Sequence, residues 1–456
     1  MRLAGLFIAV VVLVDVMCFA ADPSPSARPA KEVYLRLAGE AEANLQKEIL
    51  DKWFPAAVDE QGGGFFENYG NDWTRAAGTD KSLVYQSRLT WTSAQAAQRF
   101  PAKAEMYLAM TRRGAAVLAD KLWDKQRGGF YWSVDASGRP NQDGATQKHV
   151  YGISFGIYAL AASYQATKDP AALDLAKKGF RWLDEHAHDN VNKGYFETLS
   201  LEGKPVFPPS NVVGARGEQK SMNTSIHVLE ALTGLYHVWP DPAVKARVQE
   251  MYEICRDKIY SDPGYLTMFL TADWQRIPGQ DSFGHDVEAG YLLVEAAEAL
   301  AQGEDPRVWR AARNLVDHAL QYGWDEQRGG LYDLGNMNAE GVVIGGLRTE
   351  KIWWVEAEHL NALLMLHEHF GKQTPVYWNA FLKQWDFITK FQVDRVNGGW
   401  YPTVHEDGTP ASQVKSDRWT ECYHQGRAML NVSVQLRRLA EAASAFGGQA
   451  TGSQRP

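Results

Sequence analysis

The sequence GGFYW at residues 128–132 is one of six copies of a phrase in which glycine precedes an aromatic or large apolar pair. The other copies are GGGFF (62–66), KGYF (193–196), PGYL (263–266), GGLY (329–332) and GGWY (398–401). An aspartate leads into each copy, and these are Asp59, Asp124, Asp189, Asp262, Asp325 and Asp394. The copies recur about every 65 to 70 residues. Because such self-similarity marks a repeat architecture, the 456 residues are expected to form one closed unit.

Helical periodicity fills the segments between the phrases. Apolar residues recur at spacings of three and four, which predicts helices at 147–167, 220–238, 284–302, 351–370 and 423–445. The same pattern predicts a second set at 30–54, 83–99, 102–122, 170–187, 241–259, 306–321 and 375–391. The sequence therefore predicts about twelve helices, two in each repeat.

Two kinds of connection alternate along the chain. The short ones carry proline, at Phe100-Pro101, Asp169-Pro170, Asp241-Pro242, Asp305-Pro306 and Thr374-Pro375. Asp or Thr before Pro is typical of a helix start. The long ones hold the glycine phrases and contain hairpin-like turns such as 136–138 and 406–408. This alternation predicts an all-α (α/α)6 toroid of six helical hairpins, with short β-hairpins in the long loops at one mouth.

The N-terminus is typical of an exported protein. Arg2, the apolar run at 3–14 and the small residues near Ala20 predict a signal peptide at 1–20 and a periplasmic or secreted location. We expect a Pro/Ser linker at 21–30, the toroid at 31–445 and a flexible tail at 446–456. Cys18 leaves a lipid anchor open, whereas Cys255 and Cys422 are expected to be free thiols.

The composition argues against several classes of partner. The net charge of −8 carries no basic run, so nucleic acid is not expected, and no stretch after the signal is apolar enough to cross a bilayer. The chain contains 16 Trp, 19 Tyr and 18 Phe, and flat rings suit stacking on sugars. No GxGxxG, P-loop, HExxH or GxSxG motif is present. The aromatic content therefore favours a sugar partner, and we expect a monomer or homodimer.

The helices that follow the long loops would form the inner ring, and their first turns would meet at one mouth. Those turns and the residue before the last of them carry Arg88, Tyr151, Asn223, His227, His285, Glu288, Trp353, Trp354, Glu358, Trp419, His424 and Arg427. Asn223 and His227 share a helix face at a spacing of four, as do His285 and Glu288 at three. A lone helical histidine is most often structural, but His227, His285 and His424 occupy corresponding places in three repeats. Imidazole and carboxylate also suit metals, yet no tight His/Cys spacing supports a metal site here.

Five segments resemble the N-acylglucosamine 2-epimerase superfamily and, within it, the cellobiose (mannobiose) 2-epimerases. They are SRLTW (87–91), KSMNTSIHVLEALTGLYHVWPD (220–241), SFGHDVEAGYLLVEA (282–296), KIWWVEAEHLNALL (351–364) and RWTECYHQGRAML (418–430). The similarity covers most of 35–445. It implies an (α/α)6 barrel, which agrees with the repeat argument, and a cofactor-free epimerisation at C2 of a reducing-end sugar. Members commonly read NTHLH where this chain has Ser225, so specificity can differ.

The resemblance also implies roles for individual residues. His285 and His424 would be the acid/base pair that moves the C2 proton through an enediolate, and His227 would assist ring opening or hold O1. Arg88 would stabilise the enediolate, and Glu288 would orient a histidine. The sugar would be bound by Tyr151, Asn223, Trp353, Trp354, Glu358 and Trp419. Inversion through a planar intermediate needs two proton carriers on opposite faces, and imidazole can hold or release a proton near neutral pH.

Other functions stay open at this point. The same enediolate serves an aldose–ketose isomerase on a monosaccharide, or an N-acylglucosamine 2-epimerase. A glycoside hydrolase would use a carboxylate pair drawn from Asp286, Glu288, Glu358 and Glu421, although the histidine-rich set argues against it. A binding module with a decayed site is disfavoured by the intact histidines.

Overall fold

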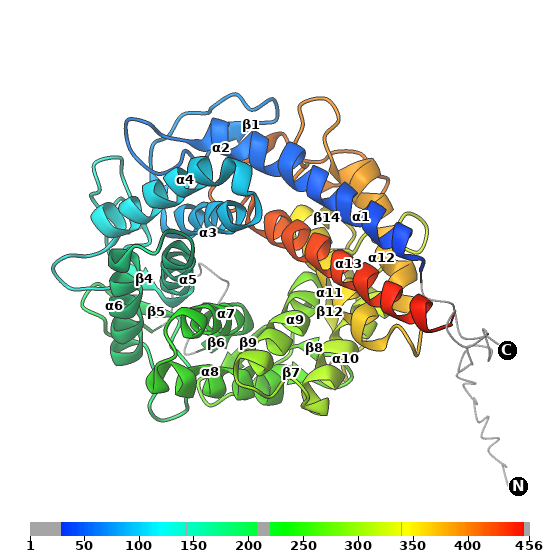
Figure 1. The fold of residues 1–456 in the computed structure, drawn as a ribbon. Coiled ribbons are helices and arrows are strands. Elements are labelled where there is room, and N and C mark those ends of the chain that lie inside the picture. Colours follow the sequence, from blue (N-terminus) through cyan, green and yellow to red (C-terminus); the bar gives the residue numbers. More distant parts are fainter. Residues whose placement is uncertain (1–28, 143, 208–218, 339, 451–456) are drawn as a thin grey trace, which may run out of the picture.

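The computed structural model describes residues 29–142, 144–207, 219–338 and 340–450 of the chain. Its helices form two concentric rings around a central axis (Figure 1). The inner ring consists of α3 (Leu83–Arg99), α5 (Val150–Thr167), α7 (Met222–Val238), α9 (Phe283–Ala299), α11 (Trp353–Phe370) and α13 (Tyr423–Ala450). The outer ring consists of α1 (Lys31–Asn44), α2 (Asp51–Ala57), α4 (Ala104–Val117), α6 (Pro170–His186), α8 (Pro242–Ile254), α10 (Pro306–Tyr322) and α12 (Val376–Phe387). This is the predicted (α/α)6 toroid.

Short tighter or wider turns extend the outer helices. The π-helical turn Leu45–Leu50 joins α1 to α2, so that these two form one rod of the ring. Three further π-helical turns follow outer helices, at Leu118–Leu122, Cys255–Ile259 and Ile388–Gln392, and a 3-10 turn at Pro101–Lys103 precedes α4. The twelve predicted helical segments therefore correspond to the observed rods, with ends that differ by a few residues.

The predicted proline starts are confirmed where aspartate precedes proline. The Asp169 side chain accepts a hydrogen bond from the Ala171 amide at 2.9 Å, and this caps α6. Asp241 and Asp305 cap α8 and α10 in the same way. Proline at the first helical position loses no hydrogen bond, because that N–H has no partner inside the helix. These caps fix where the outer helices begin.

The inner helices α5, α7, α9 and α11 bury apolar residues on all sides. A helix that is apolar all round must be surrounded by other elements, and each inner helix contacts two inner neighbours and its outer partners. The polar residues in the first turns of these helices gather at the mouth of the ring. Most of the core is one cluster between the two rings, and a second, smaller cluster includes Trp91, Phe155 and Tyr423.

In the described parts of the long loops, the strands form seven small antiparallel sheets. Their strands are β1 (Tyr69–Gly70), β2 (Lys81–Ser82), β3 (Ser133–Val134), β4 (Gln147–His149), β5 (Thr198–Ser200), β6 (Gln219–Ser221), β7 (Tyr260–Ser261), β8 (Tyr265–Leu266), β9 (Phe269–Thr271), β10 (Arg276–Ile277), β11 (Gln280–Ser282), β12 (Leu334–Met337), β13 (Val343–Arg348), β14 (Lys351–Ile352), β15 (Thr403–Val404) and β16 (Val414–Ser416). Hairpins occur within loops, as predicted, at β7–β8, β9–β10 and β12–β13.

Most sheets, however, join one loop to the next. The strand before each inner helix pairs with a strand in the following loop, giving β2–β3, β4–β5, β6–β9, β11–β12 and β14–β15. The register in the first of these pairs Lys81 with Val134 and Ser82 with Ser133. β16 pairs with β1 and closes the circle. A belt of loop-to-loop pairing therefore holds the inner-helix starts in fixed positions around the mouth.

Buried lysine–aspartate pairs lock five of the six repeats. In each, a lysine shortly before an inner helix contacts the aspartate that leads into a glycine phrase, at 2.6 to 2.9 Å. The pairs are Lys81–Asp59, Lys148–Asp124, Lys220–Asp189, Lys351–Asp325 and Lys415–Asp394. The lysines are at most 1 % exposed. Because an isolated buried charge is very costly, each pair ties its loop to the strand before the helix.

The fourth repeat is different, and Asp262 does not play the part expected of it. In the other repeats the residue just before the aspartate bridges the first apolar residue of the phrase, as Trp123 does with Phe130. In the fourth repeat the corresponding pair is Tyr260 and Leu266, the second apolar residue of its phrase. The next amide, at Thr267, donates to the Ile259 carbonyl, as the Tyr131 amide donates to that of Leu122. Ser261 therefore occupies the aspartate position. The aspartate nearest to this glycine phrase is therefore not the equivalent one, because the loop has a different turn. In that turn Asp262 accepts a hydrogen bond from the Tyr260 hydroxyl at 2.8 Å.

The ends of the chain need two remarks. The predicted signal peptide at 1–20 and nearly all of the linker lie outside the described residues. Helix α13 continues to Ala450, so part of the expected tail at 446–456 is helical. Within the described ranges, no helix is both long and apolar enough to cross a membrane. Cys255 and Cys422 are buried free thiols.

Candidate active site

A cavity of about 250 Å³ opens where the inner helices begin. The residues that line it are Arg88, Tyr151, Asn223, His227, His285, Glu288, Trp353, Trp354, Trp419 and His424. Every inner helix contributes at least one of them, and Trp419 comes from the loop before α13. All residues predicted for the site line this cavity except Glu358.

Backbone hydrogen bonds to the neighbouring loops fix the positions of these first turns. The first amide of α3, at Leu83, donates to the Trp132 carbonyl at 2.9 Å, and that of α5, at Val150, donates to Glu197 at 3.0 Å. The first amides of α7 and α11 donate to the Met268 and Pro402 carbonyls, both at 3.0 Å. Helix-start amides have no partner within their own helix, so the neighbouring loop supplies one and aligns the helices.

His424 is held by a carboxylate behind it. Its Nδ1 lies 2.6 Å from Oε1 of Glu358, which leaves Nε2 as the remaining ring nitrogen for the cavity. The Tyr291 hydroxyl donates to the other Glu358 oxygen at 2.6 Å. Burial lowers the pKa of His424 well below its usual value, and the charges of Arg88 and Arg427 lower it further. The ring is therefore neutral and able to accept a proton.

Glu358 consequently has a different place from the one predicted. It was expected to contact sugar, but it lies behind His424 and also accepts a hydrogen bond from Arg427 at 2.7 Å. Glu288 was expected to orient a histidine, yet its Oε1 is 3.9 Å from His424 Nδ1 and 2.5 Å from the Arg427 guanidinium. The carboxylate that positions His424 is thus Glu358, while Glu288 faces the cavity.

His285 is the second imidazole in contact with Trp354. The His285 and Trp354 rings are 4.7 Å apart, and the His424 and Trp354 rings 5.6 Å, measured between centroids. Nδ1 of His285 lies 2.7 Å from the Ser282 hydroxyl. Burial, followed by the charges of His227 and Arg88, lowers the pKa of His285 to about 3. Two neutral imidazoles therefore flank one indole inside a single cavity.

The third histidine has its own carboxylate. Nδ1 of His227 lies 2.8 Å from Oε2 of Glu230, three residues further along α7. Its ring packs edge-on against Tyr151, with centroids 5.3 Å apart, and against Phe155 at 4.9 Å. Burial lowers the pKa of His227, and the nearby Glu230 carboxylate only partly opposes this effect. Arg427 also bonds Glu230.

Arg88 supplies a fixed positive charge to the cavity. Its guanidinium donates to Glu421 at 2.9 Å and to the Tyr151 hydroxyl at 3.0 Å, and it lies over the Phe155 ring at 4.4 Å. Among the described residues its buried Nε has no partner. Its ion-pair partner is Glu421, which precedes the first turn of the last inner helix by two residues. An arginine this firmly held is preorganised for an oxyanion.

Several polar atoms at the cavity are left unpaired. Within the described part of the chain, Oδ1 of Asn223, Oε2 of Glu288 and Nε1 of Trp353 have no hydrogen-bond partner. Burial, then the neighbouring Glu358 charge, raises the pKa of Glu288 to about 8. Glu288 can therefore donate a hydrogen bond near neutral pH. Buried polar atoms are seldom left without partners, so this set is suited to a hydroxyl-rich ligand.

Ser225 does not face the cavity. Its hydroxyl donates to the Ser221 carbonyl at 2.8 Å, one turn earlier in α7, and it is absent from the lining residues. The departure from the NTHLH pattern thus places a small, internally bonded residue beside the site.

Sequence reasoning missed the residues that position the site. Glu230 follows His227 by three, and Ser282 and Glu421 precede His285 and His424 by three. The spacing that places side chains on one helix face could have found Glu230. Arg427 was noted at the mouth without a role, and the structure places it between Glu230, Glu288 and Glu358.

Glu288, Glu358 and His424 lie close enough together to ligate a metal. A guanidinium already occupies this position, because one Arg427 nitrogen contacts both carboxylates. A metal would have to displace that cation, so the donor set is better explained as an arginine site.

Comparison with known proteins agrees with this geometry. Residues 64–428 match the family described as N-acylglucosamine 2-epimerase (GlcNAc 2-epimerase). The chain is 30% identical over 395 residues to a cellobiose 2-epimerase of Bacteroides fragilis, covering 86% of this chain and 97% of that one. The solved structure of a cellobiose 2-epimerase from Spirochaeta thermophila superposes with a TM-score of 0.79 at 29% identity, covering 90% of this chain and 98% of that one. A cellobiose 2-epimerase from Bacillus thermoamylovorans gives 0.79 at 26%, covering 88% and 99%.

Proposed function

The chain belongs to the N-acylglucosamine 2-epimerase family, and we propose that it inverts C2 of the reducing-end residue of β-1,4-linked disaccharides such as cellobiose and mannobiose. It is a carbohydrate epimerase of the isomerase class. The observation that supports the proposed chemistry is the pair of neutral imidazoles, His285 and His424, which both lie against Trp354 in one cavity.

The reaction begins with a sugar ring that must open. His227, held by Glu230, is placed to move a proton between the ring oxygen and O1, which exposes the C1 aldehyde. The unpaired atoms of Asn223, Glu288 and Trp353 are available to the sugar hydroxyls. Ring opening matters because the C2 proton becomes acidic only beside a carbonyl.

Proton transfer at C2 follows. One histidine takes the C2 proton, and the C–H electron pair moves to make a C1–C2 double bond while the carbonyl oxygen becomes an enediolate oxygen. The other histidine then delivers a proton to the opposite face of C2 as the C1 carbonyl re-forms. No net oxidation or reduction occurs. The delivering ring takes that proton from solvent once the negative enediolate stabilises its imidazolium. The first ring returns the C2 proton to solvent, so both imidazoles are neutral again after each turnover.

Arg88 is the group assigned to the enediolate. It remains protonated throughout, and its contacts with Glu421 and Tyr151 fix its orientation. A preorganised charge aimed at a developing oxyanion contributes several kcal/mol to rate acceleration, on the order of 10²–10³ in kcat. Its unpaired Nε adds a further donor.

A disaccharide is favoured by the outer edge of the cavity. Its volume of about 250 Å³ is below the range of about 300–1,000 Å³ typical of drug-sized ligands, so it suits one sugar ring. Trp419 lies at the rim with 37% of its surface exposed, and its ring neighbours those of Tyr151 and Trp132. A second sugar would stack on this exposed indole.

We further propose that the protein works outside the cytoplasm. The proposal rests on the charged, apolar and small-residue order of residues 1–20. Cell fractionation of the full chain and of a chain starting at residue 21 tests it. A full chain retained in the cytoplasm at its unprocessed mass would refute the proposal.

The function is tested by incubating the enzyme with cellobiose, mannobiose, mannose or N-acetylglucosamine in heavy water and following C1 and C2 by NMR. We expect deuterium at C2 together with the C2 epimer of a disaccharide. New ketose signals would instead identify an isomerase, and release of two monosaccharides would identify a hydrolase. Turnover of N-acetylglucosamine alone would refute the disaccharide assignment.

A further inference from the structure

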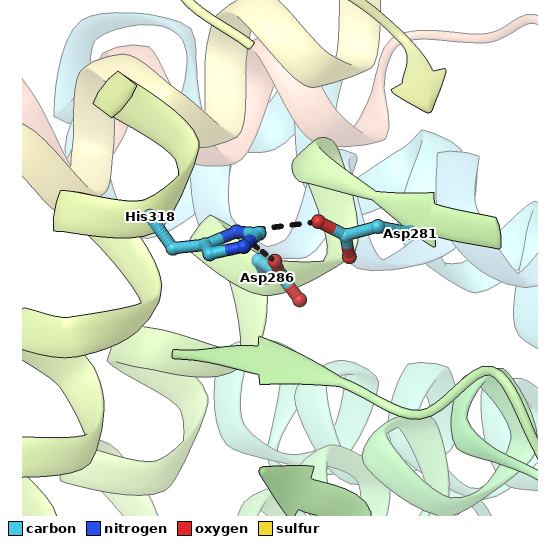
Figure 2. A group of neighbouring side chains, drawn as sticks. All are labelled: Asp281, Asp286 and His318. Atoms are coloured by element: carbon cyan, nitrogen blue, oxygen red, sulfur yellow. Dashed lines mark ion pairs between the residues drawn. The ribbon is translucent and has the colours of Figure 1, made fainter. Parts of the chain in front are cut away.

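A second cluster of chemically capable side chains lies away from the cavity, between α10 and the start of α9. Figure 2 shows Asp281, Asp286 and His318 pointing toward one another from β11, α9 and α10. Nδ1 of His318 lies 3.3 Å from Oδ2 of Asp281 and 3.9 Å from Oδ2 of Asp286. The three residues are 0%, 0% and 3% exposed. Neither the proposed reaction nor the core packing uses this convergence.

The ring orientation of His318 leaves a lone pair at the centre of the cluster. Nε2 lies 3.0 Å from the Gly341 carbonyl oxygen, which can only accept, so Nε2 carries the hydrogen. Nδ1 of the neutral ring is then an acceptor. Asp286 uses Oδ1 to accept from the Leu266 amide at 2.8 Å. Of the described residues, none donates a hydrogen bond to either Asp281 oxygen or to Asp286 Oδ2.

Three electron-rich atoms therefore face one another without a donor from the described part of the protein. Two carboxylates in contact and out of water are strongly unfavourable unless a cation or a proton joins them. The described residues place no lysine or arginine within ion-pair distance of either aspartate.

Four other repeats have a lysine at the position that corresponds to Asp281. Asp281 lies two residues before α9, as Lys81, Lys148, Lys220 and Lys351 lie before their inner helices. In those repeats a buried ammonium bonds an aspartate in the preceding loop. Here the lysine position holds Asp281 and the aspartate position holds Ser261. The fourth repeat has thus exchanged its internal cation for an additional anion and gathered a histidine beside it.

The carboxylate of Asp286 can be compared with the equivalent carboxylate in the next repeat. Glu356 stands in the first turn of α11 as Asp286 does in α9, and both accept a hydrogen bond from the first apolar residue of a glycine phrase or its neighbour. The Lys351 ammonium lies close enough to Glu356 to lower its pKa, although burial dominates and raises it to about 8. Among the residues that the structure describes, Asp286 has no such lysine.

We propose that Asp281, Asp286 and His318 bind one divalent metal ion of the zinc type, which takes the place of the lysine ammonium found in the other repeats. Two carboxylates and a dication sum to zero charge. With Zn–N and Zn–O bonds of about 2.0–2.2 Å, ligand atoms of a tetrahedral site lie roughly 3.3–3.6 Å apart, close to the 3.3 and 3.9 Å observed. The Nε2–H bond to the Gly341 carbonyl is the outer contact that a ligating histidine usually makes.

The metal would hold the start of α9, which carries His285, a proposed acid/base residue. Ser282, which holds His285, lies next to Asp281, and Asp286 lies next to His285 on the other side. An ion bound to both aspartates and to α10 therefore ties the start of α9 to the outer ring. The proposed role of the metal is structural, so metal binding can be measured without an activity assay.

The test begins with the full-length protein refolded with excess Zn²⁺, dialysed against chelator and analysed for metal by mass spectrometry. We expect about one zinc per chain. Refolding with Co²⁺ should give visible absorption bands of a four-coordinate site. His318→Gln and Asp281→Asn should lower the metal content at least tenfold. His359→Gln, which changes a buried histidine that is hydrogen-bonded to Gln384, should keep it, and so should His424→Asn.

Asp281→Lys provides the variant that remains informative if the others fail to fold. It restores the residue type of the other repeats, so it should lose the metal while keeping a cooperative unfolding transition that chelator no longer shifts. A wild-type protein that binds no Zn²⁺ or Co²⁺ would overturn the proposal and leave a protonated cluster. So would metal that survives in His318→Gln but disappears in His424→Asn.

Discussion

Glu358 Oε1 lies 2.6 Å from Nδ1 of His424, although 66 residues separate them in the chain. Both atoms are enclosed by the inner ring, and Glu358 reaches the cavity only through the imidazole. A buried carboxylate on Nδ1 fixes the ring orientation and stabilises the imidazolium when the other nitrogen takes a proton.

Replacing Glu358 with Gln should therefore lower kcat more than it changes KM. We expect a loss of about 10–100-fold in kcat, by analogy with other groups that orient a reacting imidazole. Tyr291→Phe is the matched control, because it removes the hydrogen bond to the other oxygen of Glu358 and keeps the carboxylate. Steady-state kinetics on cellobiose make the comparison. A change confined to KM would mean that Glu358 contacts the sugar.

The two proposed proton carriers should be separable by isotope exchange. His285→Asn and His424→Asn should each lower epimerisation by about 10²–10⁴-fold, the usual range for one acid/base group. If the histidines act on opposite faces, each variant should still exchange the C2 hydrogen of one epimer without inverting it. NMR in heavy water, run separately from cellobiose and from its C2 epimer, measures both. Equal exchange from both epimers in one variant would contradict the assignment.

Trp419 should matter to disaccharides only. Trp419→Ala removes the exposed indole at the rim, and we expect KM for cellobiose to rise about tenfold, equivalent to about 1.4 kcal/mol. KM for mannose, which would fill only the inner cavity, should stay within about twofold, since it makes no contact at the rim. Parallel losses on both sugars would place the indole against the reducing-end ring instead.

The lysine–aspartate pairs should dominate stability. Lys148→Met leaves Asp124 buried without its cation, which typically costs about 3–5 kcal/mol. The double variant Lys148→Met/Asp124→Asn should recover part of the loss, because an amide oxygen in place of the Asp124 carboxylate can still accept from the Gln126 and Arg127 amides. Urea unfolding followed by circular dichroism gives the three free energies. Additive losses would show that the pair is not coupled.

His285 should make stability depend on pH. Its pKa is about 3 in the folded protein because of burial, against 6.5 ordinarily. The unfolded chain therefore binds the extra proton between these values. The contribution is intact above pH 6.5 and is lost as the pH falls toward 3, by up to about 1.4 kcal/mol per pH unit. His285→Asn should flatten the unfolding free energy across this window. Parallel wild-type and variant curves would contradict the shift.

The repeat period predicted the ring because each hairpin buries its apolar faces only against its neighbours. Caps such as Asp169 are local, so a dipeptide was enough to place them. The loop-to-loop belt was not predicted, because strands of two or three residues pair across more than 50 residues of chain, as Lys81 does with Val134. The residues of so short a strand do not indicate which distant strand it pairs with.

The same limit applies inside the cavity. Arg88, His227, Glu288 and Glu358 each stand at the sixth residue of their inner helix, so periodicity places them at one depth. Whether such a side chain meets the ligand depends on what covers it. His424 and Arg427 both make hydrogen bonds to Glu358. Oε2 of Glu288 has no hydrogen-bond partner among the described residues. That choice is made by residues from other repeats.

The packing of α13 against α1 has a consequence for biosynthesis (Figure 1). Among the helices of the ring, α13 is synthesised last, and it carries both His424 and Arg427. A nascent polypeptide shorter than α13 has an open ring with three clustered glutamates and no guanidinium between them. Under the proposed mechanism, a chain that still lacks α13 has neither the second imidazole nor this guanidinium, and it should not turn over sugar.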